Sequence, residues 1–116
     1  MAIYLMGETR GFETEVVWWK REHRLNLASV LPTLLGDVRS DDWFGVADLK
    51  RDPGNESDKN AVLVSLMGKP VGYLPGDEAK RLAAWLDERE AEGTSVQANA
   101  CIQFGMNEMA VRLSLY

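Results

Sequence analysis

The sequence predicts a mainly β protein whose strands form a small barrel or a strongly bent sheet. About six short apolar segments recur along the chain, turn-forming residues separate most of them, and one long segment shows helical spacing. Short strands with turn signals at this spacing are typical of small barrels. We expect residues 1–116 to form one domain, because the chain has an ordinary domain length and no internal repeat.

The N-terminal part is expected to provide one strand and one short helix. Residues 2–8 contain the run Ile3-Tyr4-Leu5-Met6 and predict a strand. Residues 12–36 are less regular, but Leu27 to Leu35 predicts a short helix that ends at Gly36. Pro32 restricts this helix, because proline is tolerated only near a first helical turn. Residues 43–50 have the pattern of a second strand.

The C-terminal part is expected to contain a hairpin, a helix and two more strands. Residues 61–66 and 71–74 predict a hairpin around the turn Met67-Gly68-Lys69-Pro70. A helix is predicted over about 76–92, with Pro75 before its first turn and Gly93 after its end. Residues 96–104 and 109–116 predict the last strands. The apolar stripe of the helix consists of Ala79, Leu82, Ala83 and Leu86.

Composition excludes several classes of protein. The net charge of −5 opposes tight binding to a nucleic acid backbone. Cys101 and His23 are the sole cysteine and histidine, which rules out an intrachain disulfide, a cysteine-based zinc site and most catalytic triads. The N-terminus lacks a basic leader and no apolar stretch is long enough for a membrane span. We expect a cytoplasmic binding protein without cofactor or metal, and not an enzyme.

The most informative segment is the polar loop 51–62. It is dense in Asn, Asp, Pro and Gly and lies between two predicted strands. Asn and Asp bond to their own backbone in turns, so this composition is typical of a well-formed loop. Alternatively, Asn55, Asp58 and Asn60 point into a shared pocket, where Asp58 accepts a hydrogen bond from a ligand hydroxyl.

A second segment, residues 18–24, places two tryptophans beside basic residues. Such a mixture can stack bases and neutralise phosphates. Adjacent strand residues point to opposite faces, so the alternative has one tryptophan buried and the charges solvated. His23 is expected at the surface, whereas Cys101 is expected to be buried in an apolar strand.

These motifs together resemble the HIRAN domain family. The resemblance rests on Val46 to Pro53, then Asn55, then Asp58-Lys59-Asn60-Ala61-Val62, then Val71-Gly72-Tyr73-Leu74-Pro75, with Met6-Gly7-Glu8 matching the opening of such domains. It implies a small OB-like or SH3-like β-barrel with flanking helices. It also implies a non-catalytic module that grips the 3′-hydroxyl end of single-stranded DNA, with a role in DNA repair beside a helicase or nuclease.

The resemblance also implies which residues bind. Asp58 would accept a hydrogen bond from the terminal hydroxyl, and Asn55 would line the same cup. Binding members carry an aromatic where this chain has Ser57, which together with the acidic net charge predicts weak binding. The complete expected set is Asp58, Asn55, Tyr73, Arg10, Phe12, Lys59 and Met109.

An interaction module for another protein is the alternative function. The acidic charge disfavours DNA, and Trp18, Trp19 and Trp43 are candidate anchors for a protein partner. An exposed tryptophan beside an apolar patch would favour this alternative.

Overall fold

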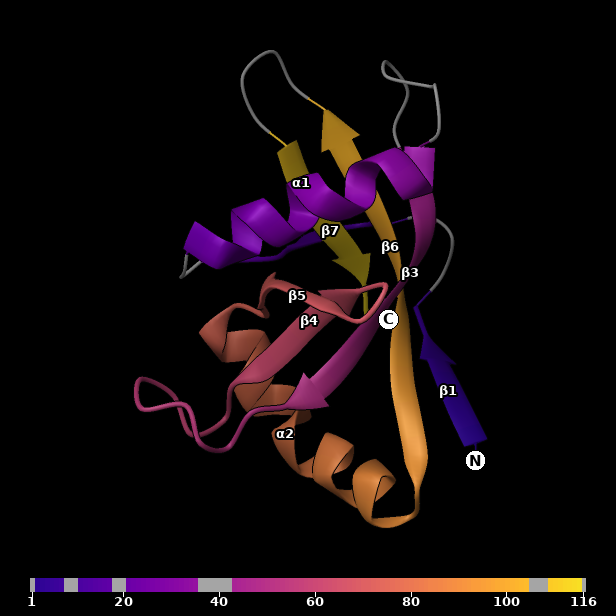
Figure 1. Cartoon of the computed structure of the whole chain (residues 1–116). Coiled ribbons are helices and arrows are strands. Elements are labelled where there is room, and N and C mark those ends of the chain that lie inside the picture. The colour runs from indigo at the N-terminus through magenta and orange to yellow at the C-terminus, as the bar shows by residue number, and fades with distance from the viewer. Residues whose placement is uncertain (1, 8–10, 18–20, 36–42, 105–108, 116) are drawn as a thin grey trace.

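The computed structural model describes residues 2–7, 11–17, 21–35, 43–104 and 109–115, with only the backbone described at 31–35, 104 and 109. These residues form seven strands and two helices (Figure 1). The elements are β1 (Ala2–Met6), β2 (Thr14–Glu15), α1 (Arg21–Leu35), β3 (Trp43–Arg51), β4 (Val62–Leu66), β5 (Lys69–Tyr73), α2 (Gly76–Ala91), β6 (Thr94–Phe104) and β7 (Met109–Ser114).

The strands form one curled sheet in the order β2-β7-β6-β3-β4-β5, and β1 also pairs with β6. The pairing of β1 with β6 is parallel, and all other strand pairs are antiparallel. Beyond β2, Val17 and Tyr73 exchange backbone hydrogen bonds of 2.8 and 2.9 Å. This bridge brings the two ends of the sheet together, so the prediction of a small OB-like β-barrel is confirmed.

The predicted β4–β5 hairpin is present, but its turn has two residues instead of four, because Lys69 and Pro70 already pair in β5. Met67 and Gly68 both have positive φ angles, of 51° and 78°. A two-residue turn of this kind matches the twist of the flanking strands. Glycine adopts the conformation without steric cost, whereas Met67 tolerates it because the hairpin fixes the turn.

Helix α2 also follows its prediction closely. Its buried residues are the four predicted from the apolar stripe, Ala79, Leu82, Ala83 and Leu86. The helix ends before Gly93, which has a φ of 78° and donates its backbone N–H to the carbonyl of Glu90 at 3.0 Å. Glycine is favoured at this position because the chain must turn into the left-handed region.

Helix α1 differs from its prediction. It begins at Arg21 rather than near Leu27, so Pro32 lies in the last turn and the expectation that it would fit only near a first turn is wrong. His23 is 1% exposed instead of lying at the surface. The cause is tertiary: α1 packs on β5, where the Asn26 side chain donates to the carbonyl of Pro70 at 2.7 Å.

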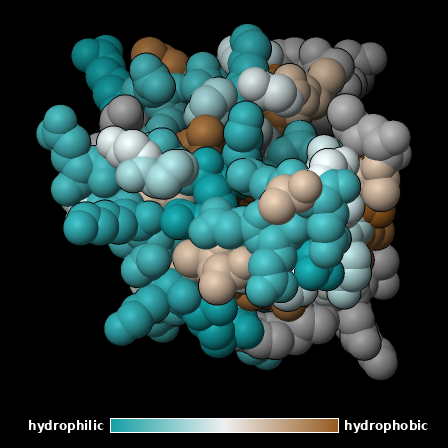
Figure 2. Space-filling model, turned by 90° about the horizontal axis from the view of Figure 1, so that it is seen from below, coloured by the Kyte–Doolittle hydropathy of each residue, from teal (hydrophilic) through white to brown (hydrophobic). Residues whose placement is uncertain are grey.

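Strand β1 is held to the rest of the molecule from two sides. The ring of Tyr4 packs edge-on against Trp85 of α2, with centroids 5.0 Å apart. Directly after the strand, the carbonyl of Gly7 accepts a 3.1 Å hydrogen bond from the Asn99 side chain of β6. Seen from the α2 side, the surface is mostly hydrophilic (Figure 2). Neither α1 nor α2 has the length and apolar character needed to cross a lipid bilayer.

Candidate nucleic-acid interface

The loop between β3 and β4 is organised by its own Asn and Asp side chains. The Asn55 side-chain oxygen accepts the backbone N–H groups of Ser57 and Asp58, at 2.9 and 3.1 Å. The Asp58 Oδ1 accepts the N–H of Asn60 at 2.8 Å. Such local bonds are the usual role of these residues in turns. The loop is therefore a preformed structure, because its short side chains already bond its backbone.

Tyr73 joins the loop to the barrel. Its side chain is 4% exposed, and its hydroxyl donates to Oδ2 of Asp52 at 2.7 Å. The Tyr73 ring also packs edge-on against His23, at a centroid distance of 5.5 Å. The predicted place of Tyr73 is thus refined: its ring is core, and only its hydroxyl reaches the loop.

Replacing Tyr73 by Phe is expected to destabilise the fold by about 1–3 kcal/mol, because the half-buried Asp52 carboxylate loses its donor. Urea unfolding measures the effect. Tyr4→Phe is the control, since that residue is 46% exposed. An unchanged unfolding midpoint for Tyr73→Phe would contradict the role of the hydroxyl.

The same pair gives a pH dependence. Burial raises the pKa of Tyr73 above its ordinary value of 10.0, and the hydrogen bond to Asp52 raises that pKa further. The unfolded chain therefore releases this proton first. The contribution of Tyr73 to stability is complete below pH 10.0 and is lost as the pH rises through the higher folded pKa. The Phe variant is expected to lack this alkaline loss.

Arg51, at the start of the loop, bonds the loop to α2. Its side chain is 8% exposed and forms a 3.0 Å ion pair with Asp87. A second guanidinium nitrogen donates to the carbonyl of Ala61 at 3.0 Å, where the loop ends. Its backbone N–H donates to the Glu90 carboxylate at 3.3 Å. These bonds hold the loop and the helix in one arrangement.

Asp58 has a second oxygen that faces the start of α2. An ideal Cβ on Gly76 would lie 3.9 Å from Asp58 Oδ2, so this oxygen lies close to the first residue of α2. Pro75, the residue before α2, provides no side-chain cap to its first turn. The half-buried Asp58 thus keeps one carboxylate oxygen for the loop and presents the other toward α2.

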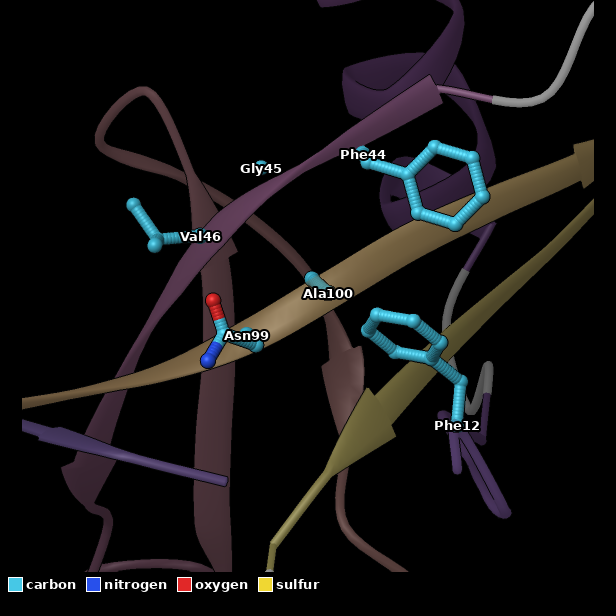
Figure 3. A pocket seen from close by; sticks show the side chains of 6 residues that line it. All are labelled: Phe12, Phe44, Gly45, Val46, Asn99 and Ala100. Atoms are coloured by element: carbon cyan, nitrogen blue, oxygen red, sulfur yellow. The ribbon is translucent and has the colours of Figure 1, made fainter. Parts of the chain in front are cut away.

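A second feature lies on the outer face of β3 and β6. It is an apolar hollow of about 250 Å³ lined by Phe12, Phe44, Gly45, Val46, Asn99 and Ala100 (Figure 3). The rings of Phe12 and Phe44 approach to 5.7 Å between centroids, at an interplanar angle of 53°. Phe44 is 63% exposed although it is a large apolar residue.

A family model for the HIRAN domain matches residues 44–115. This stretch includes the loop and most of the residues that line the hollow. That is more than half of the chain. The chain belongs to the HIRAN domain family. The HIRAN match runs from β3 to β7, so β1, β2 and α1 lie before it. No curated protein and no solved structure matches the chain.

The HIRAN residues expected at the interface do not all come together. Asn55, Asp58 and Lys59 share the loop with the Tyr73 hydroxyl beside it, whereas Phe12 packs against Phe44 in the hollow. Arg10, Trp18 and Trp19 lie outside the described residues, as does the side chain of Met109. Trp43 packs against the core, so it is a weaker candidate anchor than Phe44.

Asp52 is the residue of the candidate interface that the sequence does not single out as the partner of Tyr73. A signal was present, because Asp followed by Pro and Gly is typical of a turn that begins at the Asp. The backbone N–H of Asn55 indeed donates to the carbonyl of Asp52 at 3.1 Å. In the part of the chain that the structure describes, no group of His, Cys, Asp or Glu side chains could hold a metal ion.

Proposed function

We propose that this HIRAN domain is a non-catalytic module that binds the 3′ end of single-stranded DNA at the loop 52–60. The observation that carries the proposal is the carboxylate of Asp58. One of its oxygens accepts the backbone N–H of Asn60, and the other lies close to Gly76 at the start of α2. A carboxylate accepts hydrogen bonds, and the 3′-hydroxyl of the terminal deoxyribose can donate one.

The charges around the loop support weak binding rather than strong binding. Asp77 and Glu78 occupy the first turn of α2 and oppose a phosphate at that helix terminus. Lys59 is the one basic residue within 52–60, and Ser57 is exposed where a stacking ring would add affinity. With one phosphate neutralised, the logarithm of the binding constant should fall with log salt at a slope of about −0.7.

The end preference is tested by titrating two short fluorescent oligonucleotides, one with a 3′-hydroxyl and its twin with a 3′-phosphate. Because the carboxylate attracts a hydroxyl and repels a phosphate, we expect the hydroxyl form to bind roughly tenfold or more tightly at low salt. Fluorescence anisotropy measures both affinities. Equal affinities, or no binding by either, would overturn the proposal.

A protein-interaction module is the second candidate function, and the apolar hollow favours it. Phe44 and Val46 are 63% and 41% exposed beside the hollow, which has the size to take a large apolar side chain of a partner. The same titration separates the two candidates. A domain that binds a protein partner at this hollow would not discriminate the 3′-hydroxyl oligonucleotide from its 3′-phosphate twin.

A further inference from the structure

Strand β1 is an open edge of the sheet that the described residues form. It pairs with β6 on one side, and none of the other described strands pairs with it. Figure 1 shows it at the outer margin, with β6 beside it. Open edges are usually protected by charges, proline or bulges, and the sequence of β1, Ala-Ile-Tyr-Leu-Met, has neither charge nor proline.

The rest of the molecule shows how this protein covers an edge. The outer side of β5 is bonded to Val17 through Tyr73 and lies under α1, with the Asn26 side chain donating to Pro70. On β1, by contrast, three successive large side chains are exposed: Ile3 by 63%, Tyr4 by 46% and Leu5 by 50%. The described contacts therefore cover the outer side of β5, whereas large apolar side chains of β1 remain exposed.

We propose that β1 pairs with β1 of a second copy of this chain, antiparallel and around a two-fold axis at Tyr4. A two-fold axis through the middle residue allows all five residues to pair and keeps each side chain on its own face of the sheet. Ile3 then lies opposite Leu5 of the copy, and the two Tyr4 rings lie opposite each other. This surface is separate from the loop 52–60 and lies outside the HIRAN match.

A second copy suits this edge better than other occupants. The strand carries no cation for a nucleic acid phosphate and no polar side chain except Tyr4. Two chains of net charge −5 repel each other least where neither carries a charge. An apolar strand is also complementary to itself, which is what a two-fold contact requires.

The size of the surface predicts a weak dimer. With about half of each side chain exposed, the three large β1 residues present roughly 300 Å² of mainly apolar surface. A standard interface buries about 800 Å² on each partner, and smaller ones belong to transient complexes. The dimer should therefore form at high protein concentration and dissociate on dilution.

Sedimentation velocity of the whole chain, from about 1 µM to about 1 mM, tests the association. We expect a reversible shift from monomer to dimer. Leu5→Lys should raise the concentration at which dimers form by roughly tenfold or more, because a lysine protects an edge strand. The matched control is Leu25→Lys, which changes a similarly exposed leucine on α1 and should leave the shift unchanged.

Disulfide trapping tests the register. When the Ile3→Cys and Leu5→Cys variants are mixed and oxidised, position 3 of one copy faces position 5 of the other, and a linked dimer should form. Neither variant alone should link, because identical positions would be more than about 7 Å apart. Cys101 is buried and is common to both variants. Monomers at every concentration, a dimer that Leu5→Lys does not weaken, or linkage of Ile3→Cys with itself would each overturn the proposal.

Discussion

Replacing Gly7 by alanine is expected to destabilise the fold by about 2–5 kcal/mol. Gly7 has a φ of 84°, and a left-handed conformation costs a non-glycine residue about 1–2 kcal/mol. In addition, an ideal Cβ would lie 1.8 Å from the backbone oxygen of Ser114. Relief of such overpacking typically costs about 1–3 kcal/mol, because β1 must move away from the end of β7.

Gly11→Ala is the matched control for this prediction. Gly11 has a φ of 74°, close to that of Gly7, but a Cβ there would meet nothing within 4 Å. The difference between the two variants in urea unfolding isolates the steric term from the conformational one. If both variants lose the same stability, the close approach of Gly7 to Ser114 is not what fixes β1 to the barrel.

Replacing Asp58 by asparagine is expected to abolish the preference for a 3′-hydroxyl end. Asparagine keeps a side-chain oxygen that can accept the N–H of Asn60, so the loop should keep its shape. The second oxygen becomes an NH₂ group, which cannot accept a hydroxyl proton. A hydrogen bond to a charged group contributes about 1.5–3 kcal/mol, so the preference should fall roughly tenfold or more in anisotropy titrations.

Asp77→Asn separates this effect from a change in net charge. Both substitutions remove one negative charge, but the Oδ1 of Asp77 accepts the backbone N–H of Glu78 in the exposed first turn of α2. We expect Asp77→Asn to strengthen binding of both oligonucleotides slightly and to preserve their ratio. A loss of the ratio in both variants would show that general electrostatics, rather than the Asp58 oxygen, discriminates the two ends.

The elements that local patterns predict best are α2 and the β4–β5 hairpin. The stripe of α2 follows from helical spacing, and Gly68 and Gly93 mark positions that need positive φ angles. Helix α1 was predicted six residues too short at its start. Its stability comes from packing on β5, which contacts such as Asn26 with Pro70 provide across 44 residues of sequence.

The candidate interface likewise combines local bonds, which the sequence predicts, with long-range contacts, which it does not. The bonds of Asn55 and Asp58 to nearby N–H groups join residues two or three positions apart, so composition predicts a formed loop. The bond from Tyr73 to Asp52 spans 21 residues and was not anticipated. Phe12 was expected near the DNA end, but it packs on Phe44, a partner that only the path of the barrel brings close.

The family, most of the strands, the stripe of α2 and the self-bonded loop 52–60 can be predicted from the amino-acid sequence, because each depends on residues close together in the chain. The three-dimensional fold is needed to see that Val17 and Tyr73 close the barrel and that the loop and the apolar hollow are separate features. It also shows that β1 pairs with β6 alone among the described strands. These features arise because strand register and helix packing bring distant residues together. Such contacts depend on the whole chain, and no local pattern encodes them.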